Sequence, residues 1–140
     1  MLSCGVAPFL PVVETRENAS MSHILIVDDE PQIRLLLSTC LQQEGYEVSQ
    51  AGDGEEALKI LDKRSVDVIV LDLLMPGKEG LETLMALRKD SERPKVIAIS
   101  GGARSIGADF LPAALKLGAD KALKKPFRNE ELVSAVEELL

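Results

Sequence analysis

The chain has 140 residues, a usual length for one domain, and its 46% hydrophobic content is enough for one core but not for two. Three Phe, one Tyr and no Trp predict a core built from aliphatic side chains. The net charge is −7 and there is no run of Lys or Arg, which argues against direct binding to nucleic acid or to an anionic membrane.

Cysteine usage and hydropathy indicate a cytoplasmic protein. Cys4 and Cys40 lie far apart and lack the spacing of metal ligands. Cys40 falls on the apolar side of a helical pattern, which favours a small buried thiol. No apolar run approaches the roughly 18–20 residues that cross a bilayer. The apolar residues 6–13 contain Pro8 and Pro11 and make a poor signal peptide.

The first 20 residues are set apart from the rest. A second methionine, Met21, stands just before the first strand-like run. We expect residues 1–20 to be a leader that is disordered or that reflects an over-extended start, with a docking segment as the alternative. Residues 21–140 are then the single folded domain.

In the first half of this domain, strand-like runs alternate with helical patterns. Short apolar runs bounded by turns predict three strands, His23–Val27, Glu47–Ala51 and Val66–Leu71. Helices are predicted from Pro31 to Gly45 and over Glu55–Lys63, because Pro suits a helix start and Gly suits a helix end. Helical spacing predicts these buried residues: Ile33, Leu36, Leu37, Cys40 and Leu41 in the first helix, and Ala57, Leu58 and Leu61 in the second.

The second half contains longer loops. Residues 74–77 predict a loop, and a helix is expected from Gly80 to about Lys89. An irregular stretch separates the strand Lys95–Ser100 from a helix around Leu111–Leu117. The remaining elements are a fifth strand, Lys121–Lys124, and a final helix, Glu130–Leu140, which Asn129 would cap and which would bury Leu132, Val133, Val136 and Leu140.

Five strand–helix units with short links define the fold class as α/β. Crossovers between parallel strands are right-handed, so the expected architecture is a doubly wound, five-stranded parallel sheet with helices on both faces.

Polar residues follow four of the strands. Asp28 and Asp29 come after the first strand, Asp72 after the third, Ser100 at the end of the fourth and Lys125 after the fifth. The carboxyl ends of parallel strands meet at one edge of the sheet, where ligands bind in open α/β folds. Three carboxylates at one spot repel one another, so at least one of them should have a raised pKa. Such a cluster suits a divalent cation and a phosphoryl group.

Four motifs together resemble the receiver domain of two-component response regulators, over about Ser22 to Leu140. They are Asp28-Asp29-Glu30, Asp72-Leu-Leu-Met-Pro-Gly, Ser100-Gly and Lys125-Pro-Phe, each after its own strand. The resemblance implies the flavodoxin-like strand order 2-1-3-4-5. Because the chain stops where the fifth helix ends, we expect a stand-alone receiver without an output domain, similar to chemotaxis regulators.

The resemblance implies a role for each site residue. Asp72 corresponds to the phosphoacceptor, and Asp28, Asp29, Asp72 and the backbone carbonyl of Leu74 correspond to the ligands of Mg²⁺ or Mn²⁺. Lys125 would pair with the phosphoryl oxygens, and Pro126 would follow it through a cis bond. Ser100 would turn its hydroxyl toward the phosphoryl group and move the loop after it.

The partners follow from the same resemblance. A histidine kinase or a histidine phosphotransfer protein would supply the phosphoryl group, and a protein effector would bind the switched form. His23 is the only histidine, so the chain cannot itself be the phosphohistidine donor. Onward relay and direct effector binding both stay open. We expect a monomer or a weak, phosphorylation-dependent dimer, and no enzyme activity beyond the chain's own phosphorylation and dephosphorylation.

Some positions depart from the family pattern. Ala122 stands where the family usually has a Tyr or Phe that responds to phosphorylation, and the segment around Gly101–Asp109 looks longer than is typical. Three alternative classes compete with the receiver interpretation. A haloacid-dehalogenase-type phosphatase would need a second Asp at Leu74, and a nucleotide-binding module would need Gly-x-Gly-x-x-Gly where Asp28-Asp29-Glu30 stands. A degenerate receiver that acts only as a scaffold is the third.

Overall fold

The computed structural model describes residues 22–73, 79–88, 94–101, 115–116 and 118–140. The leader, the loop over residues 74–77 and most of the helix expected around residues 111–117 lie outside these residues. The described elements, in chain order, are β1 (His23–Val27), α2 (Pro31–Gln43), β2 (Glu47–Ala51), α3 (Gly54–Lys63), β3 (Val68–Asp72), α4 (Glu79–Arg88), β4 (Lys95–Gly101), β5 (Lys121–Lys125) and α6 (Asn129–Leu139).

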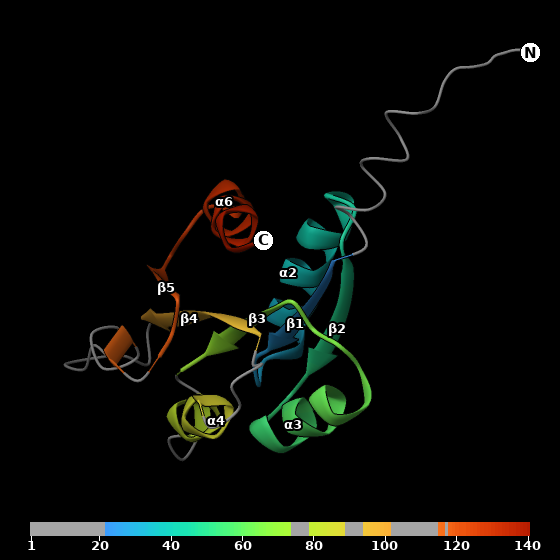
Figure 1. Ribbon diagram of the computed structural model, residues 1–140. Coiled ribbons are helices and arrows are strands. Elements are labelled where there is room, and N and C mark those ends of the chain that lie inside the picture. The colour runs from blue at the N-terminus through green and yellow to red at the C-terminus, as the bar shows by residue number, and fades with distance from the viewer. Residues whose placement is uncertain (1–21, 74–78, 89–93, 102–114, 117) are drawn as a thin grey trace, which may run out of the picture.

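The five strands form one parallel sheet in the order β2-β1-β3-β4-β5, which confirms the expected fold. Helices α2 and α6 lie on one face of this sheet, and α3 and α4 lie on the other (Figure 1). Because β1 and β3 are neighbours and both run in the same direction, the residues that follow them reach the same edge of the sheet.

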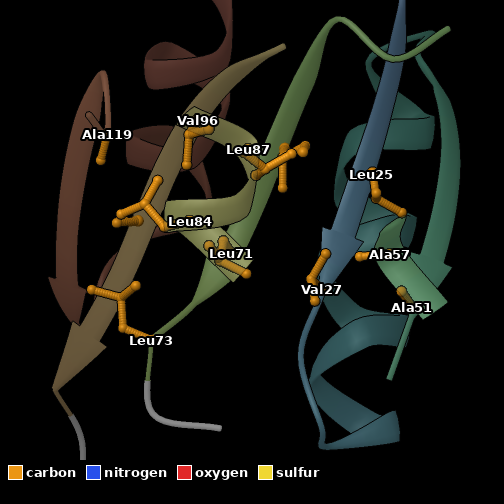
Figure 2. Close-up of a cluster of buried hydrophobic side chains, with 12 residues drawn as sticks. Leu25, Val27, Ala51, Ala57, Leu71, Leu73, Leu84, Leu87, Val96 and Ala119 are labelled. Carbon is orange, nitrogen blue, oxygen red and sulfur yellow. The ribbon is translucent and has the colours of Figure 1, made fainter. Parts of the chain in front are cut away.

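The core consists of two apolar clusters, one on each face of the sheet. Successive strand residues point to opposite faces, so Leu25 and Val27 face α3 while Ile24 and Ile26 face α2 and α6. Figure 2 shows the first cluster, in which Leu84 and Leu87 of α4 lie against the sheet. All residues of β1 and β3 are buried, as is usual for inner strands of a parallel sheet covered on both faces.

Some predicted element ends are wrong. The third strand begins at Val68 instead of Val66, and it includes Asp72 as its last residue. Asn129 does not cap the last helix but is its first residue, because Arg128 occupies the N-cap. The backbone N–H of Arg128 donates to Oε1 of Glu131 at 3.0 Å, so the Glu side chain stabilises this helix start. Gly45, with φ of 96°, ends α2 as predicted.

Three residues predicted to be buried are exposed: Leu36 (56%), Leu58 (37%) and Leu140 (52%). In α2, Leu37 and Leu41 pack on the sheet and Ser38 is buried beside them. Residues of an α-helix are about 100° apart, so a helix that buries Leu37 and Ser38 turns Leu36 outward. Cys40 is only half-buried. Among the described helices, none combines the length and the apolar character that crossing a membrane requires.

Candidate functional site

Three carboxylates meet at the carboxyl-terminal edge of the sheet. Asp28 follows β1 and is 2% exposed, Asp72 ends β3 and is 1% exposed, and Asp29 is half-buried. Each offers one oxygen, and the three oxygens lie within 4.8 Å of one another. The structure thus brings together the acidic residues that the sequence predicted to converge.

Asp28 is held by its backbone and by one side-chain oxygen. Its N–H donates to the carbonyl of Ala51 at 3.1 Å, and its Oδ1 accepts from the N–H of Glu30 at 2.9 Å. Its carbonyl accepts from Nη1 of Arg34 at 2.6 Å. These contacts leave Oδ2 directed at the centre of the site, where Lys125 lies.

Lys125, the last residue of β5, supplies a positive charge to the site. Its Nζ lies 3.8 Å from Oδ2 of Asp28 and 3.9 Å from Oδ2 of Asp72, and its side chain is 21% exposed. The Lys125–Pro126 peptide bond is cis. Ser100 near the end of β4 is 1% exposed, and its hydroxyl has no hydrogen-bond partner among the described residues.

Burial within the acidic cluster raises the pKa of Asp28 to about 6. Burial is the main cause, and the neighbouring carboxylates of Asp72 and Asp29 add to it, whereas the Glu30 N–H and the Lys125 ammonium oppose it. This confirms the expectation that one carboxyl of the cluster has a raised pKa. A divalent cation would relieve the repulsion, and carboxylate oxygens are the ligands that Mg²⁺ prefers, so the residues present fit such an ion.

Two residues that contact this site were missed by the sequence reasoning. Arg34 was not singled out, although it lies one turn into the helix that follows the acidic pair. Gly80 was interpreted only as a helix start. A Cβ at Gly80 would lie 2.6 Å from the carbonyl oxygen of Asp72 and 2.6 Å from Cα of Leu73, so α4 begins in direct contact with the end of β3.

The other predicted site residues have different outcomes. Leu74 and residues 102–109 of the longer segment lie outside the described residues. Ala122 is half-buried in β5. Pro126 lies at the surface next to Lys125 and helps to line an apolar hollow that also contains Ile33, Leu36, Leu37 and Phe127.

A doubly wound sheet with clustered carboxylates and a lysine at its carboxyl edge defines a class of phosphoryl-accepting signalling domains. Residues 24–137 match the response regulator receiver domain, and the chain belongs to this family. The family is that of two-component signalling, so the chain is a domain of phosphorelay systems.

Curated relatives share the domain but are longer. The transcriptional regulatory protein CpxR of Escherichia coli K12 is 41% identical over 123 residues, which cover 86% of this chain and 50% of CpxR. The probable transcriptional regulator ycf27 of Cyanidium caldarium is 39% identical over 130 residues, which cover 91% of this chain and 50% of that protein. The chain therefore spans about half the length of the curated relatives it matches.

Solved structures agree with the fold. The response regulator TrrA of Thermotoga maritima, in complex with Mg²⁺ and BeF, is 39% identical with a TM-score of 0.74, covering 86% of this chain and 100% of TrrA. The chemotaxis response regulator CheY4 of Vibrio cholerae is 33% identical with a TM-score of 0.73, covering 86% of this chain and 99% of CheY4.

Proposed function

We propose that this chain accepts a phosphoryl group on Asp72 from a phosphohistidine donor, in a reaction that depends on Mg²⁺ or Mn²⁺, and thereby changes its binding to a protein partner. The observation that carries the proposal is the set of charges around Asp72. Two further carboxylates lie within 4.8 Å of it, and the Lys125 ammonium lies 3.9 Å from its Oδ2.

The transfer requires a fixed nucleophile. The N–H of Leu73, next to Asp72, donates to the carbonyl of Ile99 at 2.9 Å, so the backbone of Asp72 is held by the sheet. A carboxylate oxygen of Asp72 would attack phosphorus in line. An O–P bond forms as the N–P bond of phosphohistidine breaks, and the electron pair returns to the imidazole, which takes up a proton. Such reactions depend mainly on positioning and on charge neutralisation.

The residues around Asp72 and the bound cation would together neutralise the negative charge of the carboxylates and of the phosphoryl group. When bound, the cation would screen the carboxylates from the incoming phosphoryl oxygens, and Asp28, Asp29, Asp72 and the carbonyl of Leu74 are its proposed ligands. Lys125 would pair with a phosphoryl oxygen as a compact ammonium. The Ser100 hydroxyl, which is without a described partner, would donate to another oxygen.

The switch itself would start at Ser100. A hydroxyl that turns toward the phosphoryl group moves the chain that follows β4, and an added charge can bias such a two-state segment. Ala122 cannot act as a rotating aromatic side chain because it has only a methyl group. We infer that the signal leaves the site through the segment after Ser100.

A protein donor fits the surface next to the site. Lys125 lines both the acidic site and the apolar hollow, where Leu36 is 56% exposed and Leu35 in the same helix is 63% exposed. Leu36→Asp should slow transfer from any histidine kinase that phosphorylates the wild type, and it should leave the reaction with acetyl phosphate unchanged. Equal effects on both donors would show that the hollow is not a docking surface.

The target of the switch is proposed to be a protein surface. A separate effector, a histidine phosphotransfer protein that receives the phosphoryl group, or a further segment of a longer polypeptide would each fit. CpxR, a transcriptional regulatory protein about twice as long as the matched region, illustrates the last arrangement. Rapid and reversible transfer from Asp72 to a phosphotransfer protein would favour relay.

The proposal is tested by the intact mass of the chain after incubation with acetyl phosphate, with and without Mg²⁺. We expect one phosphoryl adduct that requires Mg²⁺ and that Asp72→Ala abolishes. Asp62→Asn, which changes an exposed carboxylate on α3, should keep the adduct. Absence of an adduct in the wild type, also with a histidine-kinase donor, would favour the scaffold alternative.

A further inference from the structure

We infer that Arg34 is a positioning residue of the acidic site: its guanidinium holds the backbone carbonyl of Asp28, and this contact sets the affinity of the site for a divalent cation. The inference rests on the proposed function, since it concerns the same cation site. It adds a residue that does not itself offer a ligand atom to the ion.

The contact lies where the sheet ends. The strand β1 stops at Val27, and the N–H of Asp28 still bonds to Ala51 of β2. The carbonyl of Asp28 accepts from Nη1 of Arg34 at 2.6 Å. The backbone N–H of Arg34 also donates to the carbonyl of Glu30 at 3.0 Å. One residue of α2 therefore spans the whole turn that carries the acidic pair.

The neighbouring turn leaves room for the guanidinium. A Cβ at Gly52 would lie 3.1 Å from Nη1 of Arg34, which is closer than ordinary van der Waals contact. The N–H of Gly52 is held by Oε1 of Glu56 at 2.7 Å, so this turn is fixed by α3. The side chain of Arg34 thus lies between two fixed segments, the end of β1 and the turn after β2.

This arrangement decides which oxygen of Asp28 faces the site. With the N–H, the carbonyl and Oδ1 all bonded, Oδ2 is the oxygen that remains near Lys125. Loss of the Arg34 contact frees the peptide unit between Asp28 and Asp29, and both carboxylates can then turn away. Removing outer partners that orient metal ligands typically weakens metal affinity about 10–100-fold.

The direction of the change in Mg²⁺ affinity distinguishes a positioning role of Arg34 from a purely electrostatic one. A cation near a carboxylate cluster opposes the binding of a second cation, so removing the Arg34 charge without any positioning role would strengthen Mg²⁺ binding. If Arg34 positions Asp28, its removal weakens Mg²⁺ binding despite the lost repulsion.

The experiment is isothermal titration of the metal-free chain with Mg²⁺, at a temperature where circular dichroism shows the folded state. We expect Arg34→Met, which keeps much of the apolar stem, to raise the Kd about 10-fold or more. The Mg²⁺ concentration that gives half-maximal phosphorylation by acetyl phosphate should rise together with the Kd.

Arg64→Met is the matched control. The Arg64 guanidinium pairs with Glu47 and lies near Ser49 at the opposite edge of the sheet, so its loss should leave the Kd unchanged. Gly52→Ala is the second variant. It displaces the guanidinium while keeping its charge, and it should raise the Kd by a smaller factor than Arg34→Met.

An unchanged or lower Kd in Arg34→Met would overturn the inference. If that variant does not fold, an unchanged Kd in Gly52→Ala overturns it instead. These results differ from a failure of the proposed function, in which the wild type would bind no Mg²⁺ and form no adduct. Normal binding and phosphorylation in the wild type, with no effect of either variant, would remove only the role of Arg34.

Discussion

At the amino-terminal edge of the sheet, His23 is buried, and its backbone nitrogen and both ring nitrogens have hydrogen-bond partners. At the carboxyl-terminal edge, Asp28 and Asp72 are as deeply buried, but there the two carboxylates lie close to each other. The N–H of His23 donates to Oδ2 of Asp67 at 2.8 Å. Nδ1 lies 2.9 Å from the carbonyl of Ser65, which can only accept, so Nδ1 carries the proton.

Other polar groups near the amino-terminal edge also have hydrogen-bond partners. Nε2 of His23 lies 2.7 Å from the hydroxyl of Ser49, and Arg64 donates to that hydroxyl at 3.4 Å. Asp120, just before β5, accepts from the N–H of Val96 in β4 at 2.8 Å. Asp67 does the same for β1 from its place just before β3. Buried polar groups satisfied in this way support the fold.

The carboxyl-terminal edge differs from the amino-terminal edge in how its buried polar groups are arranged. Burial, together with the neighbouring carboxylates, raises the pKa of Asp28, and the hydroxyl of Ser100 has no described partner. Buried polar groups that are not fully satisfied within the fold are expected at a functional site, because these groups are needed for its chemistry. Under the proposed function, stability and phosphoryl transfer therefore depend on opposite ends of the same strands.

The largest expected effect is at the amino-terminal edge. His23→Ala removes a buried ring, and the Ser65 carbonyl and the Ser49 hydroxyl lose the hydrogen bonds that the ring makes with them. The free energy of unfolding should therefore fall by about 2–4 kcal/mol. Urea unfolding measures this change. The rate of adduct formation with acetyl phosphate should stay near that of the wild type at low temperature, where the variant is folded. A folded variant that no longer forms the adduct would show that the amino-terminal edge is also needed for the reaction.

The next effect concerns pH. Because the pKa of Asp28 is raised from 3.8 to about 6 in the folded chain, the protonated form favours folding, and this contribution is present below about pH 4 and lost as pH rises through 6. The shift corresponds to roughly 3 kcal/mol. In metal-free buffer, Asp28→Asn should gain about that much stability relative to the wild type between pH 4 and pH 7.5.

Urea unfolding of both proteins across this pH range gives the difference directly. Saturating Mg²⁺ should reduce the trend, because the cation favours the charged carboxylate. A difference in stability that is flat with pH would contradict the raised pKa of Asp28.

A smaller effect is expected from Gly80→Ala. The new Cβ would meet backbone atoms of Asp72 and Leu73, so either α4 or the end of β3 must shift. Overpacking of this kind costs about 1–3 kcal/mol. A shift at the end of β3 would move Asp72, so phosphorylation at saturating Mg²⁺ should also slow. Gly52→Ala should cost less stability, because its one tight contact would be with the end of the Arg34 side chain. Loss of stability without any slowing would show that Gly80 serves packing alone.

The smallest effects come from Ser49, which bonds to His23 at the amino-terminal edge, and from Ser100 at the carboxyl-terminal edge. Ser49→Ala removes a hydroxyl that bonds to His23 and Arg64, and it should lower the free energy of unfolding by about 1–2 kcal/mol. Ser100→Ala removes a buried hydroxyl without a described partner, and stability should stay the same or rise slightly. Parallel urea titrations compare the two variants. Equal losses would remove the distinction between the edges.

The sequence predicted the parallel sheet and the convergence of Asp28, Asp72 and Lys125, because short apolar runs followed by charged residues define where each buried strand ends. Leu36 was misjudged because periodicity gives the spacing of a helical stripe but not how far the helix is rotated on the sheet. Arg34 contacts a backbone atom of Asp28, and Gly80 lies against backbone atoms of Asp72 and Leu73. Such contacts depend on how α2 and α4 pack, which no local pattern contains.

The central claim is that the buried charges at the carboxyl-terminal edge are kept for Mg²⁺ and a phosphoryl group. The most direct test is the thermal unfolding midpoint of the wild type and of Asp72→Asn, measured alone, with Mg²⁺, and with Mg²⁺ and beryllofluoride, the combination present in TrrA. Ligands that bind only the folded state raise the midpoint. We predict a rise with Mg²⁺ in the wild type, a larger rise when beryllofluoride is added, and no beryllofluoride effect in Asp72→Asn. A wild-type midpoint that responds to neither ligand would contradict the account.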